Sequence, residues 1–351
     1  MNSLNRITLK DVAARAKLSV AAVSMALRDH PSLPAATVAR VKKVAAALGY
    51  APDPAMSALA AHRTRLRVRR DFSVIALVSN YASRHLWLRR ESAQRLLAGA
   101  TARAQALGYA LEHLWAREDG MSPERFGEVL LARGIRGVIL APFEHPTDRF
   151  DLDWRQFAVV TVERPTRYTF FPHVVTNYFA DTVLAWSQFH ARGYRRIGLV
   201  VNSGLAERTA HQWEAAHTFE QTRLKAEPVP TLVVGETGRS EKIRAWLRHH
   251  RPDAVLCRSE GLLEAAAAEG LRIPRDLGYA SLNVLDDAPG VSGILQRRDV
   301  MGATAVDVIH GLLHRNHRGP HAVSSGTHID GVWHEGRTLH AVGKGGAAPG
   351  A

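Results

Sequence analysis

The side chains with the most informative chemistry lie near the N-terminus, between Thr8 and Arg28. Hydroxyl groups in this segment can donate hydrogen bonds to phosphate oxygens, and the small and apolar side chains beside them can contact thymine methyl groups. If a helix begins at Ser19, four of these side chains lie on its outer face: Val20, Ala21, Ser24 and Met25. A recognition helix offers such a face to the major groove of DNA.

Two short helices around a tight turn would position these side chains. Thr8 with Asp11 three residues later is a capping-box pattern, which begins the first helix. Apolar residues at helical spacing give each helix an inward face: Leu9, Val12, Ala13 and Ala16 in the first, and Val23, Ala26 and Leu27 in the second. The pattern is typical of a helix-turn-helix, although any hairpin of two amphipathic helices has the same periodicity.

Charge favours the first of these interpretations. Residues 1–70 contain 13 Lys and Arg against three Asp and no Glu, so +10 of the formal net charge of +13 lies in the first fifth of the chain. A concentrated cationic surface neutralises phosphates, and its affinity for DNA falls steeply with salt because counterions are released. A solvated helix face that binds nothing usually mixes both signs.

A third helix and a hinge are predicted next. After Pro34, four apolar residues recur at helical spacing: Val38, Val41, Val44 and Leu48. Gly49 then ends the helix. In the segment 51–61, Asp53 can cap a short alanine-rich helix and Pro54 suits its first position. Such a short helix is marginal in water, so we expect it to order only against a second copy of the chain and DNA.

One ordered set of motifs covers this whole region: Thr8-Leu9-Lys10-Asp11-Val12-Ala13, Leu18-Ser19-Val20, Val23-Ser24, Leu48-Gly49-Tyr50-x-Pro52 and Leu59-Ala60. Through these motifs the chain resembles the LacI/GalR family of bacterial transcription regulators. The resemblance implies that the recognition helix enters the major groove and that the hinge helices of two subunits pair. It also implies that Leu59 inserts into the minor groove, where an apolar wedge kinks DNA.

The resemblance assigns DNA contacts residue by residue: Val20, Ala21 and Met25 to the bases, and Ser19, Ser24, Thr37 and Tyr50 to the DNA backbone. Ala21 and Met25 stand where family members commonly have a long polar residue or Arg, so neither can read a purine by paired hydrogen bonds. We therefore expect specificity from thymine methyl contacts, Arg28 and DNA shape. Lys17 replaces a frequent turn glycine, and Asp53 a frequent asparagine.

After a basic connector at 63–70, the pattern becomes that of an α/β protein. Apolar runs predict strands at 74–78, 109–115, 138–141, 159–162, 197–201, 232–234, 254–257 and 279–282. Helices are predicted at 91–107, 123–133, 181–192, 207–222, 240–250, 262–269 and 301–314. Alternation of this kind predicts parallel sheets. About 270 residues exceed one core, so we expect two Rossmann-like subdomains with a ligand cleft between them.

Weaker motifs extend the resemblance to the family's periplasmic-binding-protein-like (type I) domain, as far as about Thr338: Gly99-Ala100, Arg133-Gly134-Ile135, Gly193-Tyr194-Arg195-Arg196-Ile197, the segment 270–277, Gln296 with Gly302, and Gly331-x-Trp333. The cleft departs from the family, with Ser259-Glu260 at a frequent Asn-Asp pair and Asn283 at a frequent Asp. We expect a carbohydrate-derived effector to contact Asn80, Tyr81, Arg208, His211, Glu260, Asn283 and Gln296, with Trp213 stacking on it. Each of these residues could instead be an ordinary surface residue or a packing residue that contacts no effector.

Other chemistry has little support in the sequence. His310 and His314 are four residues apart, but no acidic or cysteine partner completes a zinc spacing, so we expect no metal and no other cofactor. Cys257 is the only cysteine and ends an apolar strand, which suits inert packing in a reducing compartment. Neither a nucleophile elbow nor a phosphate-binding or dinucleotide glycine motif is present, so we expect no enzyme. Without a leader or membrane-spanning stretch, we expect a cytoplasmic protein.

The sequence therefore predicts a homodimeric transcriptional repressor that binds a pseudo-palindromic double-stranded DNA operator and responds to a small-molecule effector. Residues 6–62 would form the helix-turn-helix domain with its hinge helix, 63–71 a basic linker, 72–342 the effector-binding and dimerisation domain, and 343–351 a disordered tail. Two alternatives stay open: a sugar-binding protein with an incidental basic N-terminus, and an enzyme with a DNA-binding appendage. Effector identity, operator sequence and the direction of the response also stay open.

Overall fold

The computed structural model describes residues 7–27, 33–50, 73–118, 121–145, 150, 152–163, 170–235, 237–258, 261–287 and 289–342. They belong to two compact units, which are described separately. Several sequence predictions fall outside the described residues: Arg28, Asp53, Leu59, Glu260, the hinge helix, the linker and the tail.

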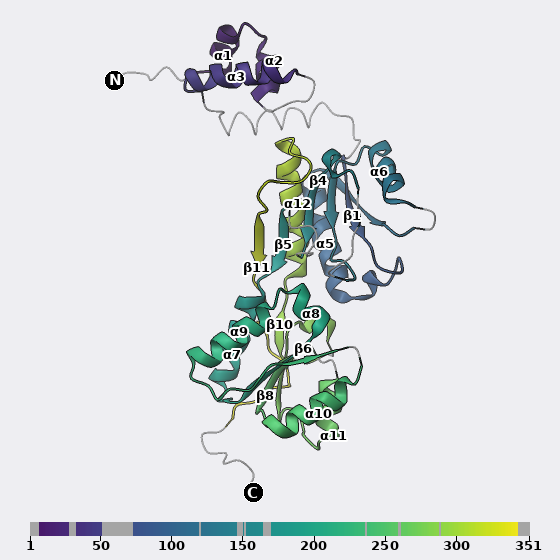
Figure 1. The fold of residues 1–351 in the computed structure, drawn as a ribbon, viewed down its shortest axis with the longest axis vertical. Coiled ribbons are helices and arrows are strands. Elements are labelled where there is room, and N and C mark those ends of the chain that lie inside the picture. Colours follow the sequence, from purple (N-terminus) through teal and green to yellow (C-terminus); the bar gives the residue numbers. More distant parts are fainter. Residues whose placement is uncertain are drawn as a thin grey trace, which may run out of the picture. The chain divides into compact units, whose positions relative to one another are not determined.

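The N-terminal unit is a three-helix cluster built from α1 (Leu9–Ala16), α2 (Val20–Leu27) and α3 (Ala35–Ala47), as Figure 1 shows. All three helices were predicted from apolar spacing. Their inward residues form one core: Val12, Ala13, Ala16, Val23, Ala26, Val41 and Ala45, with Leu9, Leu18, Leu27, Val38, Val44 and Leu48 packed around it. Because Val23 and Ala26 are fully buried, the rotation of α2 about its axis is fixed.

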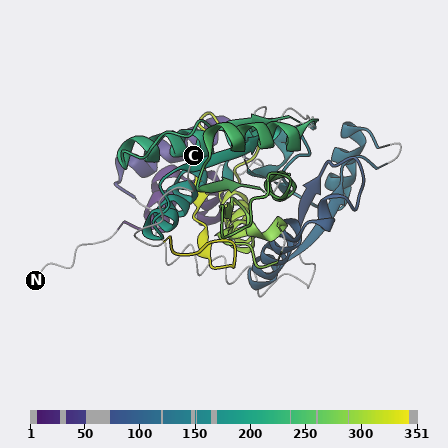
Figure 2. The same ribbon diagram turned by 90° about the horizontal axis from the view of Figure 1, so that it is seen from below.

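The larger unit contains two six-stranded sheets (Figure 1 and Figure 2). The first has the order β11 (Gly326–Ile329), β5 (His173–Thr176), β4 (Ala158–Val162), β3 (Gly137–Leu140), β1 (Ser73–Ser79) and β2 (Tyr109–Trp115). Its helices are α5 (Glu91–Ala106), α6 (Pro123–Ala132) and α12 (Arg298–His314), with short 3-10 turns η1 (Trp87–Arg89) and η2 (Trp154–Gln156). Gly99 and Gly302 let α5 and α12 touch backbone to backbone.

The second sheet has the order β12 (Val332–His334), β10 (Gly293–Leu295), β9 (Gly278–Ser281), β8 (Ala254–Cys257), β6 (Ile197–Asn202) and β7 (Leu232–Val234). Alternate strand residues face opposite sides. Leu199 and Leu256 face α7 (Tyr178–Ala191) and α9 (Gln212–Arg223), whereas Val200 and Val255 face α10 (Arg239–His250) and α11 (Leu262–Ala268). Helices therefore cover both faces, as the Rossmann-like prediction requires.

The chain passes between the two sheets three times: from β5 to α7, from β10 to α12, and from β11 to β12. We call the three connections the crossovers, and the parts built on the first and second sheet the first and second subdomain. Among the described residues, no helix is both long and apolar enough to cross a membrane.

Two sequence expectations need correction. The helix predicted at 207–222 is in fact two, α8 (Ser203–Arg208) and α9, because Ala210 and His211 adopt left-handed backbone angles, with φ of 50° and 58°. In addition, β5, β10, β11 and β12 were not predicted. Each is only three or four residues long, and β11 and β12 are mostly exposed, so these two strands lack the continuous apolar run that marked the equally short β8.

Candidate nucleic-acid interface and ligand cavity

The predicted recognition helix is positioned by its first residues. The Ser19 hydroxyl oxygen accepts a 3.1 Å hydrogen bond from the Ala22 N–H and so caps α2. Val20 keeps 42% of its surface exposed, and Ala21 is exposed as well. Ser24 and Met25 are half-buried on the same helix. The outward face of α2 therefore begins with small and apolar groups.

The turn before α2 uses a backbone conformation that favours glycine. Lys17 has φ 54° and ψ 46°, which is left-handed, and its N–H bonds the carbonyl oxygen of Ala14. At the other end of α1, the Asp11 carboxylate accepts hydrogen bonds of 2.7 Å from the Thr8 N–H and 2.6 Å from the Thr8 hydroxyl. These bonds, the side-chain one foremost, lower the pKa of Asp11. The predicted capping pair is confirmed.

Thr37 and Tyr50, predicted to face the DNA backbone, lie at opposite ends of α3. Thr37 is half-buried in the first turn. Tyr50 follows Gly49, whose φ is 67°, and its N–H bonds the carbonyl oxygen of Ala45 at 3.0 Å. Its ring packs against the helical core. The structure thus describes seven of the nine predicted DNA-contacting residues in one unit, and their contacts with DNA stay predictions.

A cavity of about 230 Å³ lies in the larger unit, lined by residues of both subdomains. One wall comes from neighbouring strands β5 and β11, and the other from α8, the start of α9 and their junction. The lining residues are Glu163, His173, Val175, Tyr178, Glu207, Arg208, Thr209, Ala210, Gln212 and His328. We call this space the intersubdomain cavity. Its size and its mixture of apolar and hydrogen-bonding groups suit a small polar molecule.

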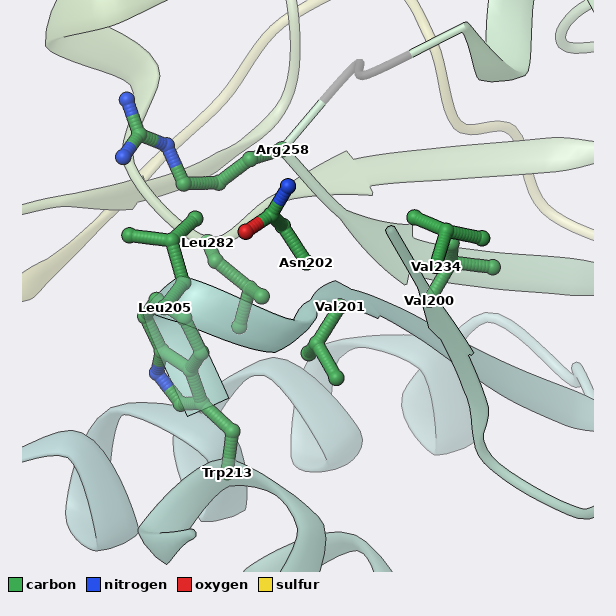
Figure 3. A pocket seen from close by; sticks show the side chains of 8 residues that line it. All are labelled: Val200, Val201, Asn202, Leu205, Trp213, Val234, Arg258 and Leu282. Atoms are coloured by element: carbon green, nitrogen blue, oxygen red, sulfur yellow. The ribbon is translucent and has the colours of Figure 1, made fainter. Parts of the chain in front are cut away.

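A second cavity, shown in Figure 3, is confined to the second subdomain and measures only about 10 Å³. Figure 3 shows Trp213 beneath Leu205, with Asn202 and Arg258 at the opposite side. A space of this size is on the order of one water molecule. It is therefore too small for an effector.

Arg208 is the predicted effector residue that lines the intersubdomain cavity. Its Nη1 and Nη2 donate hydrogen bonds of 2.6 Å to the carbonyl oxygens of Phe143 and Glu144, which follow β3. Asn80, after β1, supports the same loop, because its Oδ1 accepts a hydrogen bond from the Glu144 N–H at 3.4 Å. Tyr81 beside it is 4% exposed, and its carbonyl oxygen accepts from the indole of Trp115. Arg208 and Asn80 therefore meet at Glu144 through the protein's own hydrogen bonds.

The remaining predicted effector residues that the structure describes are not among the residues that line the cavity. His211 is exposed and pairs with Glu214, with 2.9 Å between Nδ1 and Oε1. Trp213 is 2% exposed in the core of the second subdomain, where its ring meets the edge of Tyr178.

Asn283 and Gln296 both lie near the carboxyl end of β9. The Asn283 amide donates to Asp286 at 3.1 Å. The Gln296 amide donates to the Leu282 carbonyl oxygen at 3.2 Å, and its Oε1 accepts from Arg298. Both side chains are buried. Contact of these four residues with an effector stays a prediction.

Sequence reasoning missed a buried charged cluster beside the cavity. Glu163 directly follows β4, has a left-handed φ of 65° and is 4% exposed. Arg298 Nη1 donates to its Oε1 at 2.5 Å, and the Tyr178 hydroxyl donates to its Oε2 at 2.6 Å. Burial, followed by the Glu163 charge, raises the pKa of Tyr178. Burial is the largest single effect on Arg298 and lowers its pKa, but the charge and hydrogen bond of Glu163, together with Tyr178 and Asp286, raise this pKa above its usual value.

A second buried carboxyl, also missed, lies at the crossovers. Asp181 Oδ1 accepts a 2.8 Å hydrogen bond from the Gly331 N–H, on the segment between β11 and β12. Its Oδ2 has no hydrogen-bond partner among the described residues. Burial raises the pKa of Asp181 to about 7. Next to it, the Asn177 amide donates to Asp330 at 2.7 Å and so joins two crossovers.

The fold and these sites define the class of protein: a helix-turn-helix unit linked to a core of the periplasmic-binding-protein type. Residues 8–53 match the family described as "Bacterial regulatory proteins, lacI family", and residues 186–331 match the "Periplasmic binding protein-like domain". The chain belongs to the LacI/GalR family and is a DNA-binding regulator of transcription. The predicted family and fold class are thereby confirmed.

Similar proteins cover nearly the whole chain. The HTH-type transcriptional repressor PurR of Escherichia coli O1:K1 (APEC) is 24% identical over 320 residues, which are 86% of this chain and 89% of PurR. A transcriptional regulator CelR–cellobiose complex has a TM-score of 0.58 at 18% identity, over 95% of this chain and all of that one. The Lac repressor dimer bound to operator and the anti-inducer ONPF has a TM-score of 0.55 at 19% identity, over 96% and 100%.

Proposed function

We propose that the protein is a homodimeric transcriptional repressor that reads a pseudo-palindromic operator with two copies of its N-terminal unit. A small molecule in the intersubdomain cavity would control its affinity for DNA. The observation that carries the proposal is the outward face of α2, where exposed Val20 and Ala21 follow the Ser19 cap within a unit matched by the lacI family. One unit makes too few contacts for useful specificity, which favours a dimer.

The contacts proposed for this face are apolar at the bases and polar at the phosphates. Val20, Ala21 and Met25 carry no hydrogen-bonding group that distinguishes a purine, so they would contact thymine methyl groups. Ser19, Ser24, Thr37 and Tyr50 would contact the DNA backbone. Arg28 and Leu59, outside the described residues, complete the proposed set, with Leu59 as the minor-groove wedge.

The proposed effector is derived from a carbohydrate. His173, Thr209, Gln212 and His328 supply donors and acceptors around the cavity, and Tyr178 supplies an aromatic wall. A ring that carries hydroxyl groups has matching chemistry. The CelR relative was solved with cellobiose, which is a sugar, and this supports the choice of ligand class.

The mechanism we propose is a shift between two arrangements of the subdomains. A ligand that touches both walls stabilises the arrangement in which it makes more contacts. That shift would change the spacing of the two hinges and therefore the affinity for DNA. We propose no catalytic reaction, and a cytoplasmic site of action follows from the proposed operator binding.

Selection of bound duplexes from a random pool, followed by fluorescence anisotropy with the full-length protein, tests this function. Val20→Ser should weaken binding to the selected duplex by about 5- to 30-fold, because an apolar base contact is lost. Ala47→Ser, at the exposed end of α3, is the matched control and should have no effect. Equal affinity of the wild-type protein for the selected duplex and for a base-shuffled duplex would refute the proposal and favour a sugar-binding protein.

A further inference from the structure

Arg208 belongs both to the intersubdomain cavity and to the contact between the subdomains. It ends α8 in the second subdomain and lines the cavity. Both of its terminal nitrogens nevertheless donate to the loop that follows β3 in the first subdomain, at 2.6 Å each. A molecule that bound this guanidinium in the cavity would therefore act directly on a bridge between the subdomains.

The charge of Arg208 is poorly compensated. Its two hydrogen-bond partners are neutral carbonyl oxygens, and among the described residues no carboxylate forms an ion pair with it. Its Nε is buried and has no hydrogen-bond partner in the part of the chain that the structure describes. By contrast, the buried Arg298 is paired with Glu163, and Arg258 with Asp286. Because only neutral carbonyl oxygens bind this half-buried guanidinium, its positive charge is not neutralised and it can still bind an anion.

The other charged groups that line the cavity do not neutralise the charge of Arg208. Glu163 lines the cavity, but Arg298 and Tyr178 already bind its two oxygens. Glu207 is exposed to solvent, where its charge is screened. On the opposite wall, His328 carries ring nitrogens that can donate a hydrogen bond to an oxyanion.

We propose that the ligand of the intersubdomain cavity carries an oxyanion, a carboxylate or a phosphate, which Arg208 binds. This proposal rests on the proposed function and narrows its effector to a sugar acid or a sugar phosphate. A carboxylate or phosphate offers the guanidinium an opposite charge and two acceptor oxygens that match its fork, whereas each carbonyl oxygen offers only a neutral acceptor. The ligand therefore withdraws the guanidinium from Phe143 and Glu144 and releases this bridge.

Thermal unfolding of the full-length protein with defined probes tests the proposal. The probes are D-gluconate, D-glucose 6-phosphate, inorganic phosphate and D-glucose, each against KCl of equal ionic strength. At least one sugar anion should raise the melting temperature saturably and more than D-glucose does. A response to gluconate identifies a carboxylate ligand. A response to glucose 6-phosphate but not to inorganic phosphate identifies a sugar phosphate.

Arg208→Gln should weaken the binding of that anion by about 10- to 100-fold. Arg125→Gln, which removes an exposed arginine of α6, is the matched control and should bind as the wild type does. If Arg208→Gln is unfolded by circular dichroism, Arg208→Lys takes its place, and an intermediate affinity is expected because the charge stays but the fork is lost.

Two results would overturn the proposal: neutral D-glucose stabilising as strongly as the anions, or no anion exceeding KCl. Operator binding measured on the same preparations separates this failure from that of the proposed function. Sequence-specific DNA binding without an anion effect rejects only the role of Arg208.

Discussion

The Tyr178 hydroxyl donates a 2.6 Å hydrogen bond to Oε2 of Glu163, and this bond joins the first residue of α7 to the residue that directly follows β4. Tyr178 packs in the core of the second subdomain, against Trp213. Glu163 belongs to the first subdomain, where Arg298 binds its other oxygen. The bond is buried and therefore ties the two subdomains together beside the cavity.

Replacing Tyr178 with Phe should show how much the Tyr178–Glu163 hydrogen bond contributes to the free energy of unfolding. The ring stays, but a buried carboxylate loses a donor, and such a loss costs about 1–3 kcal/mol of unfolding free energy. Urea denaturation of the wild type and Tyr178→Phe measures this difference. An unchanged midpoint and slope would mean that the bond does not hold the subdomains.

Stability should fall in mild acid because of His217. This residue is 1% exposed, accepts a hydrogen bond from the Trp186 indole at Nδ1, and lies with Nε2 3.3 Å from the Val229 carbonyl oxygen. Burial lowers its pKa from 6.5 to about 4. Between these two values the unfolded chain binds a proton that the folded chain does not, so stability is lost as the pH falls from 6.5 towards 4.

The pKa difference corresponds to about 3 kcal/mol at full extent. Denaturation at several pH values, compared with His217→Gln, isolates the effect because every other group is shared. The stability of the wild type relative to the variant should decline across this window. A difference that does not vary with pH would contradict the assignment of a neutral, buried His217.

The contact between α5 and α12 should depend on glycine. A Cβ on Gly302 would lie 2.1 Å from the Leu96 carbonyl oxygen, so Gly302→Ala must push the helices apart. We expect a loss of about 3 kcal/mol of unfolding free energy.

Gly311→Ala in the same helix is the matched control. Its Cβ would meet only the flexible end of Arg315, at 3.4 Å or more. Because alanine favours a helix over glycine, the control should gain up to about 1 kcal/mol. Equal effects of the two substitutions would refute the close helix contact.

Lys17→Gly should stabilise the helix-turn-helix. Lys17 adopts φ 54°, a conformation that costs a residue with a Cβ about 1 kcal/mol and costs glycine little. Hydrogen exchange of the amides of α1 and α2 should slow in the full-length protein. Lys43→Gly removes the same charge from the middle of α3 and should speed exchange instead. If hydrogen exchange slowed in both variants, the stabilisation would come from the loss of a positive charge and not from relief of backbone strain at Lys17.

The sequence located the elements well where apolar runs were long or firmly bounded. The predicted bounds of β2, β7 and β8 agree with the structure. The break between α8 and α9 could not be predicted, because its left-handed residues, Ala210 and His211, are neither glycine nor asparagine. At Lys17, by contrast, the sequence did hold a signal. Family members often have glycine at this turn position, and the Lys17 backbone is in fact left-handed.

Tertiary pairing limited what could be predicted of the cavity. Arg208 was predicted because the family often has an arginine-rich segment after the strand 197–201, and it lines the cavity. Glu163 and Arg298 are 135 residues apart, and they meet only because the crossovers bring the start of α12 to the end of β4. Neither residue belongs to a local motif. A single sequence therefore holds no signal for their ion pair.

Sequence-specific DNA binding by the N-terminal unit is tested most directly by a salt-dependent anisotropy titration of the full-length protein on its selected duplex and on a base-shuffled duplex. We expect tighter binding to the selected duplex at moderate ionic strength, and a loss of affinity for both duplexes with added salt as counterions are released. Binding that is equal for both duplexes at every salt concentration would contradict this expectation.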